Sequence, residues 1–412
     1  MKILHVGYSD TKGGANIAMM RLHHSLIKQK INSKVLVVEK LSDDPNVLGP
    51  SKSLELIFND LKQILVRQKK YFFKNNEIYS HSVNFFRSPI LKKINEINPD
   101  VVNLHWVNNE LLSIEQIGKI QKPIVWTFLD MWPMCGGEHY TNTSFYSDGY
   151  DKDNNKKKKS LFDLNSYLWK KKMNSWNNKL INVVCISDWL KKKAQESQLF
   201  KNSKIYKINC DIDPNVWKPV DKNTARQILN LPKDKKLFLF VSTNGVNDLR
   251  KGFKFIDNSL KTILKQRNDF ELIIIGRNKG IENKPYKFKV IDNISGQNTN
   301  ELRLLYSACD ILLAPSLMEA FGQVASEASS CGTPTVAFDD TGLADIIVHK
   351  KNGYLSKYLD QDDYTKGIEW LLSNIETENV VDNCLKIFNE KFSNFSISKK
   401  YIEIYKSLKN KN

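Results

Sequence analysis

The sequence of 412 residues lacks several features that would place it in a specialised class of protein. No apolar run approaches the roughly 18 residues that a membrane-spanning helix needs. The six cysteines are scattered, with no C-x-x-C pair and no zinc-ligand spacing. The start, MKILHVGYSD, has one lysine and no small-residue cleavage site, which predicts a first β-strand and not a signal peptide. We therefore expect a cytoplasmic protein with reduced thiols.

The composition allows substantial hydrophobic cores and places most of the excess charge in one region. Hydrophobic residues make up 41% of the chain and aromatic residues 10%, and the length suits two domains. Of the net charge of +17, residues 152–207 contribute +11, from 15 lysines against four acidic residues. Charge alone would permit nucleic-acid binding, but the sequence has no recognisable nucleic-acid-binding module, so we expect no nucleic-acid partner.

Short runs rich in β-branched residues alternate with longer amphipathic stretches. This α/β pattern occurs twice and predicts parallel sheets covered by helices, with ligands bound at the carboxyl ends of the strands. The predicted strands are KILHVG, SKVLVVE, VVNLHW, PIVWTF and NVVCIS in the first half, then KLFLFVS, FELIIIG, FKVID, DILLAPS and PTVAF in the second.

We predict a first domain over residues 1–206, a linker over 207–221 and a second domain over 222–395. The final segment, 396–412, is expected to be a helix that returns to the first domain. Two such domains facing each other would form a cleft.

Two carboxylates, Glu319 and Glu327, flank a predicted helix start near Phe321 or Gly322, and Gly332 with the following proline predicts the helix end. Even on one continuous helix, eight residues span about 12 Å. A glycosidase pair must flank one bond at roughly 5 to 10 Å. The spacing suits an elongated ligand with phosphates at the helix N-terminus and a hydroxylated group at each end, as in a nucleotide-sugar. The alternative is that both are ordinary surface glutamates.

The stretch PSLMEAFGQVASEASSCGTPTVAF, residues 315–338, resembles the Glu-x7-Glu signature of family 4 glycosyltransferases, and GLADIIVHKKNGYL, residues 342–355, extends the match. The family comprises retaining enzymes of the GT-B fold, with two Rossmann-like domains facing across a cleft. The resemblance implies that Glu319 contacts the donor sugar and Glu327 the ribose. It also implies that backbone N–H groups meet the sugar and phosphate around Phe321, Gly322 and Gln323.

The segment STNGVNDLRKGF, residues 242–253, resembles the family loop whose cations neutralise the leaving diphosphate. By this resemblance Arg250 and Lys251 would stabilise the negative charge that develops when the sugar-phosphate bond breaks. An isolated Arg-Lys pair is otherwise a common solvated feature. The strand, the loop and Gly252 favour the functional interpretation.

The N-terminal GYSDTKGGANIAMMRLHHSL predicts a strand, a glycine loop and a helix, in which Gly13 and Gly14 would let the backbone approach a ligand closely. Together with VNLHWVN and WTFLDMWPMCGGEHY, it resembles more narrowly the colanic-acid-type and related surface-polysaccharide glycosyltransferases.

The sequence also departs from that narrower pattern. Where the subgroup commonly has T-x-H-D, this chain has T-F-L-D, so Leu129 replaces a histidine often found near the reacting sugar. His105, at the end of a predicted strand, and His139 are candidate replacements, against the alternative that each is structural. Thr341 stands in place of a glycine. These departures would tune donor choice or weaken activity.

The stretch KKKKSLFDLNSYLWKKKMNSW, residues 156–176, has apolar residues near helical spacing between its lysines. The favoured interpretation is a helix packed on the first domain with a solvated basic face. The alternative is docking on anionic lipid head groups, which would give peripheral membrane contact through 152–207. The apolar positions are Leu161, Leu164, Leu168 and Trp176.

A D-x-D triplet formed by Asp211 and Asp213 falls in the predicted linker, so we expect no metal there and no cofactor. The sequence thus predicts a metal-independent, retaining transferase of hexosyl type. It would use a UDP- or GDP-sugar, with the base near residues 294–296, and a surface-polysaccharide or lipid-linked saccharide acceptor. The alternatives are a degenerate GT-B protein that binds a partner or membrane, and a GT-B epimerase. Donor sugar, linkage and oligomeric state do not follow from the sequence.

Overall fold

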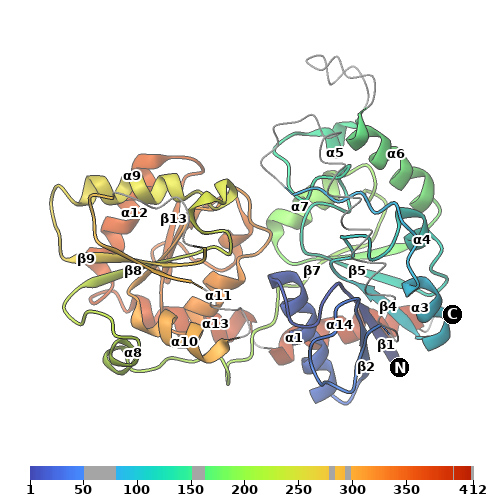
Figure 1. Ribbon diagram of the computed structural model, residues 1–412, viewed down its shortest axis with the longest axis horizontal. Helices are drawn as coiled ribbons and strands as arrows, with labels where there is room; N and C mark the ends of the chain where they lie inside the picture. The colour runs from blue at the N-terminus through green and yellow to red at the C-terminus, as the bar shows by residue number, and fades with distance from the viewer. Residues whose placement is uncertain (51–79, 151–162, 278–283, 293–297, 393, 410–412) are drawn as a thin grey trace. The chain divides into compact units, whose positions relative to one another are not determined.

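The structure, a computed structural model, describes residues 1–50, 80–150, 163–277, 284–292, 298–392 and 394–409. The chain divides into two compact units (Figure 1). Unit 1 comprises Met1–Asn209 and Phe395–Asn412, and unit 2 comprises Cys210–Asn394. The stretch predicted as a linker therefore overlaps the end of unit 1 and the beginning of unit 2.

In the described residues, unit 1 has a parallel sheet with strand order β3-β2-β1-β4-β5-β6-β7. The central strands are buried along their whole length, as expected for a sheet with helices on both faces. The strands are β1 (Lys2–Val6), β2 (Asn32–Leu36), β3 (Val47–Leu48), β4 (Val101–Leu104), β5 (Ile124–Phe128), β6 (Ile181–Cys185) and β7 (Ile205–Lys207).

The helices of unit 1 include one from the far end of the chain. They are α1 (Gly14–Lys28), α3 (Ile90–Ile97), α4 (Ile114–Gly118), α5 (Phe145–Asp148), α6 (Leu164–Trp176), α7 (Asp188–Glu196) and α14 (Asn394–Lys409). Residues of α1 and α14 share one hydrophobic cluster with β1, β4, β5 and β6.

Helix α14 is also tied to unit 1 by buried polar contacts. Asn103 on β4 donates from Nδ2 to the hydroxyl of Tyr405 at 2.6 Å. Ser25 on α1 donates to the hydroxyl of Ser398 at 2.8 Å. The C-terminal helix is therefore part of the core of unit 1.

Unit 2, within the described residues, has a parallel sheet of order β10-β9-β8-β11-β12-β13. Its strands are β8 (Lys236–Val241), β9 (Phe270–Ile275), β10 (Phe288–Ile291), β11 (Ile311–Ala314), β12 (Thr335–Phe338) and β13 (Gly353–Ser356). Its helices are α8 (Lys222–Ile228), η3 (Gly245–Asn247), η4 (Leu249–Lys251), α9 (Phe253–Ile263), α10 (Thr299–Ala308), α11 (Gln323–Ser330), η5 (Gly342–Asp345), α12 (Gln361–Asn374) and α13 (Val380–Phe392).

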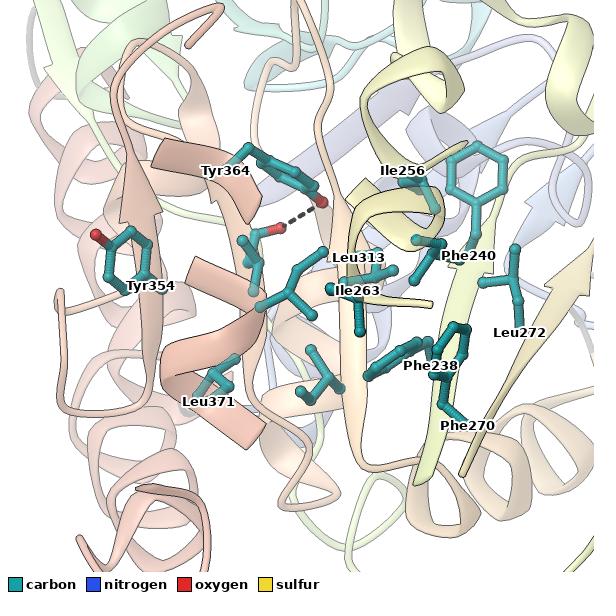
Figure 2. Packing of buried hydrophobic residues seen from close by; sticks show 14 of the residues in the cluster. Phe238, Phe240, Ile256, Ile263, Phe270, Leu272, Leu313, Tyr354, Tyr364 and Leu371 are labelled. Carbon is teal, nitrogen blue, oxygen red and sulfur yellow. Dashed lines mark hydrogen bonds between the residues drawn. The ribbon is translucent and has the colours of Figure 1, made fainter. Parts of the chain in front are cut away.

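The core of unit 2 lies between its sheet and the helices α9 and α12 (Figure 2). Phe238 and Phe240 of β8 meet Ile256 and Ile263 of α9 there. The hydroxyl of Tyr364, on α12, donates to the carbonyl of Val336 at 3.4 Å, so its polar atom is satisfied inside this apolar layer. This packing provides a rigid base for the loops at the carboxyl ends of the strands.

The strands predicted from the sequence are present, and the predicted class of two parallel-sheet α/β domains is confirmed. The sequence analysis missed β3, β7 and β13, each of which lies at the edge of its sheet. The predicted helix after Gly322 is α11, which ends at Ser330.

Helix α6 contains part of the basic segment. Leu164, Leu168 and Trp176 are buried, as the interpretation of a packed helix requires, whereas Leu161 lies outside the described residues. Lys172 does not belong to a solvated face, because it is fully buried. Its ammonium donates to the carbonyl of Trp132 and to two further carbonyls, and lies 3.6 Å from the centre of the Trp132 ring.

The other two acceptors of Lys172 are the carbonyls of Cys135, at 2.9 Å, and Gly136, at 2.8 Å. Burial lowers the pKa of Lys172 to about 7. The lysine thus connects α6 to the loop that follows β5.

Replacing Lys172 by methionine keeps much of the side-chain volume but leaves three buried carbonyl groups without their donor. We expect Lys172→Met to lower the free energy of unfolding by about 2 kcal/mol. Urea unfolding measures this change. Lys192→Met, at an exposed position of α7, is the matched control and should stay within about 0.5 kcal/mol of the wild type. Equal stability of both variants would contradict the assigned role.

Candidate functional site

The order of strands in unit 2 defines where a ligand site is expected. β8 has β9 on one side and β11 on the other, so the chain changes direction across the sheet between β8 and β11. Loops that leave the carboxyl ends of two such strands diverge and create a binding crevice. The loop after β8 contains η4, and the loop after β11 contains Glu319. Both predicted family motifs therefore meet at this switch point.

The two loops are joined through their main chains. The N–H of Leu317 donates to the carbonyl of Arg250 at 2.8 Å. Gly252 has a positive φ of 69°, and a Cβ atom built there would lie 2.0 Å from the carbonyl oxygen of Pro315. Only glycine fits this close approach without strain. The contact fixes the main chain on both sides of the switch point.

The joined loops bring Glu319, Arg250 and Lys251 together. Lys251 Nζ lies 2.6 Å from Glu319 Oε2, and Arg250 Nη1 lies 3.4 Å from the same oxygen. Arg250 Nη1 also donates to the carbonyl of Met318 at 2.9 Å. The carboxylate is 14% exposed and the two cationic side chains are 19% and 20% exposed. Arg250 Nη2 also lies 3.6 Å from Asp248 Oδ2, so the cluster pairs two positive charges with two negative charges near the surface.

The pKa of Glu319 reflects this arrangement. Burial opposes ionisation of the carboxyl group, but the charges of Lys251 and Arg250 and their hydrogen bonds outweigh it and lower the pKa to about 2. The glutamate is therefore ionised at any physiological pH.

The Glu319 loop also packs against η5. The N–H of Gly342 donates to the carbonyl of Glu319 at 2.8 Å, and a Cβ atom on Gly342 would lie 2.4 Å from the carbonyl oxygen of Ala320. Thr341 precedes it in an extended conformation, with its hydroxyl accepting from Leu343 N at 3.3 Å. Its φ of −145° does not require glycine. The substitution at Thr341 is thus compatible with the loop geometry.

Glu327 lies on α11, 7% exposed, and has a different partner from Glu319. The hydroxyl of Tyr306, on α10, donates to Glu327 Oε2 at 2.9 Å. Helix α11 begins at Gln323, directly after Gly322, whose φ is 97°. The first-turn N–H groups of a helix are the ones without intrahelical acceptors, which is where the sequence analysis placed the phosphate. The backbone roles predicted near Phe321 stay predictions.

The strand order of unit 1 also reverses, between β1 and β4. The loop after β1 ends at Gly13, which has a φ of 83° and precedes α1, and Gly14 is the first residue of that helix. His105 follows β4 directly. Both predicted features therefore lie at the switch point of unit 1, and their contacts with a ligand stay predictions.

The immediate surroundings of His105 are those of a core histidine. It is 3% exposed, and its Nε2 lies 2.9 Å from Nδ1 of His5. Burial lowers the pKa of His105 to about 3, so the ring is neutral at physiological pH. This geometry favours the structural alternative for His105.

His139, the second candidate, belongs to a polar network centred on Asp130. Its Nδ1 lies 2.7 Å from Asp130 Oδ2, and its Nε2 lies 2.8 Å from the hydroxyl of Ser82. The indole of Trp106 also donates to Asp130 Oδ2, at 2.9 Å. Leu129 is half-buried beside this network. The sequence analysis did not select Asp130, although it is the last residue of the T-F-L-D motif.

Three further sequence predictions concern Asp213, residues 294–296 and the basic segment. Asp213 accepts a hydrogen bond from Asn215 N at 3.0 Å, a local turn contact. The expected base contact at residues 294–296, and residues 152–162 of the basic segment, lie outside the described residues. None of the described helices combines the length and apolar character needed to cross a bilayer.

The charge cluster predicts a specific dependence of stability on pH. The pKa of Glu319 is about 2 in the folded protein and 4.5 as a reference, so its ionisation stabilises the fold above pH 4.5, and this contribution is lost as pH falls toward 2. Between pH 7 and pH 3 the loss should be about 2 kcal/mol. Urea unfolding of wild type and Glu319→Gln at both pH values measures it. The variant should lose correspondingly less, and equal losses would contradict the assignment.

Comparisons with known proteins agree with this geometry. Residues 221–383 match the family model for glycosyl transferases group 1. An uncharacterized glycosyltransferase of Methanocaldococcus jannaschii, MJ1607, is 31% identical over 193 residues, 45% of this chain and 48% of that protein. The first three curated relatives are matched over 42% to 55% of their own lengths, about half of each.

Solved structures resemble the chain over nearly its whole length. The structure of Alr3699/HepE of Anabaena, in complex with UDP and glucose, has a TM-score of 0.66 and a sequence identity of 16%. The match covers 99% of this chain and 100% of the Anabaena chain. The structure of WaaG, a glycosyltransferase involved in lipopolysaccharide biosynthesis, has a TM-score of 0.62 and a sequence identity of 15%. The match covers 98% of this chain and 99% of the WaaG chain. At these identities the likeness establishes the fold, two Rossmann-like domains of the GT-B class.

The matching family model and the named relatives together confirm the resemblance predicted from the motifs: residues 221–383 match the group 1 glycosyl transferases.

Proposed function

We propose that the chain transfers a hexosyl group from a UDP- or GDP-sugar to a surface polysaccharide or lipid-linked saccharide, with retention of configuration and without a metal in the transfer step. The observation that carries the proposal is the cluster of Glu319, Lys251 and Arg250 at the switch point of unit 2.

The charges of the cluster suit a nucleotide diphosphate. Glu319 and Asp248 balance the charges of Lys251 and Arg250 and hold both cations in position, and in the proposal these two cations contact the diphosphate. When the sugar-phosphate bond breaks, negative charge accumulates on the diphosphate. Cations placed beforehand stabilise that charge without reorganisation. This supports a reaction in which protein side chains take the role that a metal ion has in other transferases.

The two glutamates are assigned to opposite ends of the donor. In the proposal Glu319 accepts hydrogen bonds from sugar hydroxyls and Glu327 accepts them from the ribose. Tyr306 supports the second role because its hydroxyl orients the carboxylate of Glu327 through Oε2. The diphosphate would lie against the first turn of α11, between them in sequence.

The acceptor is the least constrained part of the proposal. The involvement of WaaG in lipopolysaccharide biosynthesis supports a lipid-linked saccharide, and the UDP and UDP-glucose complexes of Alr3699/HepE support a nucleotide-sugar donor. A cytoplasmic location, with contact between the basic residues 152–207 and the inner face of the membrane, would bring the enzyme to such an acceptor.

The proposed roles are tested by turnover of a panel of UDP- and GDP-sugars with membrane lipid extract as the source of acceptor. We expect Lys251→Met and Glu319→Gln each to lower kcat/KM by about 100-fold or more, since each removes a group that acts on the reacting centre. Lys254→Met, at an exposed position on α9, is the matched control and should change kcat/KM by less than about twofold.

Full turnover by both Lys251→Met and Glu319→Gln would contradict the roles proposed for Lys251 and Glu319. A wild-type chain that binds neither UDP nor GDP in calorimetric titration would support a degenerate GT-B binding protein instead, the alternative motivated by Leu129. Turnover in the presence of EDTA, and the anomeric configuration of the product by NMR, test metal independence and retention separately.

Removing the hydroxyl of Tyr306 should weaken nucleotide binding through Glu327. For Tyr306→Phe we expect about five- to tenfold weaker binding of the preferred nucleoside diphosphate, from the loss of one hydrogen bond to a carboxylate. Calorimetry with UDP and GDP measures the change. Tyr286→Phe, which removes a hydroxyl bound to Asp257 in the same unit, is the control. Equal affinities of the two variants would contradict the role of Tyr306.

A further inference from the structure

Three side chains of the types that bind transition metals meet in unit 1, whereas Glu319, Lys251 and Arg250 belong to unit 2. His23 and His24 are consecutive on α1, and Asp44 lies in the loop between β2 and β3. His24 Nε2 is 3.1 Å from Asp44 Oδ2, and His23 Nε2 is 3.8 Å from the same oxygen. One ligand atom from each residue lies within 4.8 Å of the other two.

The position of Asp44 is set by its loop. Its Oδ1 accepts from Asn46 N at 2.8 Å, which leaves Oδ2 directed at the two histidines. Asp10, after β1, holds the same loop by accepting from Leu41 N and Ser42 N, each at 2.9 Å. The carboxylate is therefore presented by an ordered turn.

His23 has the features of a metal ligand whose ring is held in position by a hydrogen bond at its other nitrogen. Its side chain is fully buried, and its Nδ1 lies 2.7 Å from the hydroxyl of Ser33, which is buried on β2. Within the described residues its Nε2 has no hydrogen-bond partner. When Nδ1–H donates to Ser33, Nε2 presents a lone pair toward Asp44. A hydrogen bond from the ring nitrogen that does not bind the metal fixes the tautomer of most metal-binding histidines.

We infer that His23, His24 and Asp44 bind one divalent transition-metal ion, of which Zn²⁺ is the representative. Metal–ligand bonds of about 2.0 to 2.1 Å place neighbouring ligand atoms about 3.3 Å apart, close to the two separations observed here. Two imidazoles and one carboxylate favour Zn²⁺, Co²⁺ or Ni²⁺ over Mg²⁺ and Ca²⁺, which prefer oxygen ligands alone. Water completes the coordination.

The surroundings allow an ion to enter. The side chain of His24 is 55% exposed and that of Asp44 is 19% exposed, so the cluster opens to solvent on one side while His23 closes the other. Binding displaces the proton shared between His24 and Asp44, and the adjustment needed falls mainly on the exposed His24. The ion connects the second half of α1 to the loop between β2 and β3. It takes no part in the proposed sugar transfer.

The test uses the full chain with any affinity tag removed, treated with EDTA and then dialysed free of it. Calorimetric titration with Zn²⁺ should show one equivalent bound, and Zn²⁺ should raise the Tm, because an ion that binds only the folded state stabilises it. Co²⁺ in place of Zn²⁺ should give visible absorption bands of a site with nitrogen and oxygen ligands.

Two variants change one ligand each without touching the buried histidine. His24→Ala and Asp44→Asn should each weaken Zn²⁺ binding by at least about tenfold, whereas His349→Ala, at an exposed histidine of unit 2, should leave it unchanged. The inference is overturned if the wild type binds no Zn²⁺, if either ligand variant binds it as tightly as the wild type, or if Co²⁺ shows thiolate charge-transfer bands from the cysteines.

Discussion

The main-chain contact between the loops that follow β8 and β11 determines the geometry of the candidate transfer site. It depends on a single hydrogen bond from Leu317 to Arg250 and on the absence of a side chain at Gly252. Because both loops leave buried neighbouring strands, the contact inherits the rigidity of the sheet. Arg250 and Lys251 therefore stand beside Glu319 before a ligand arrives, and ligand binding does not have to order them.

The sequence was informative about the fold wherever burial dominates. The central strands consist mainly of apolar residues, and all of those predicted are present. The missed strands, β3, β7 and β13, are edge strands of four residues or fewer. An edge strand is paired on one side only, so its residues need not be apolar, as the half-buried residues of β7 illustrate. Such strands are determined by the neighbour they pair with, which a local pattern does not contain.

The candidate site was predictable to the extent that its residues are close in sequence to strand ends. Glu319, Arg250 and Lys251 each follow a predicted strand, and parallel topology brings such positions together. Tyr306 could not be found in this way, because it lies within α10 and meets Glu327 only through helix packing.

Pairs formed by tertiary contact were equally inaccessible from the sequence. His5 lies on β1 and His105 directly follows the adjacent strand β4, and their rings meet in the core. Lys172 was indistinguishable from its solvated neighbours until the three carbonyl groups around it were known. In each case the deciding partner is distant in the chain.

The position of helix α14 in the chain has a consequence for folding during translation. The core of unit 1 includes Ile397, Tyr401 and Tyr405, so this unit lacks part of its interior until these residues, which follow unit 2 in the chain, have been synthesised. Unit 2 is contained within Cys210–Asn394 and has all of its own strands earlier. Although most of unit 1 precedes unit 2 in the chain, unit 1 therefore cannot complete its core until unit 2 and helix α14 have been translated.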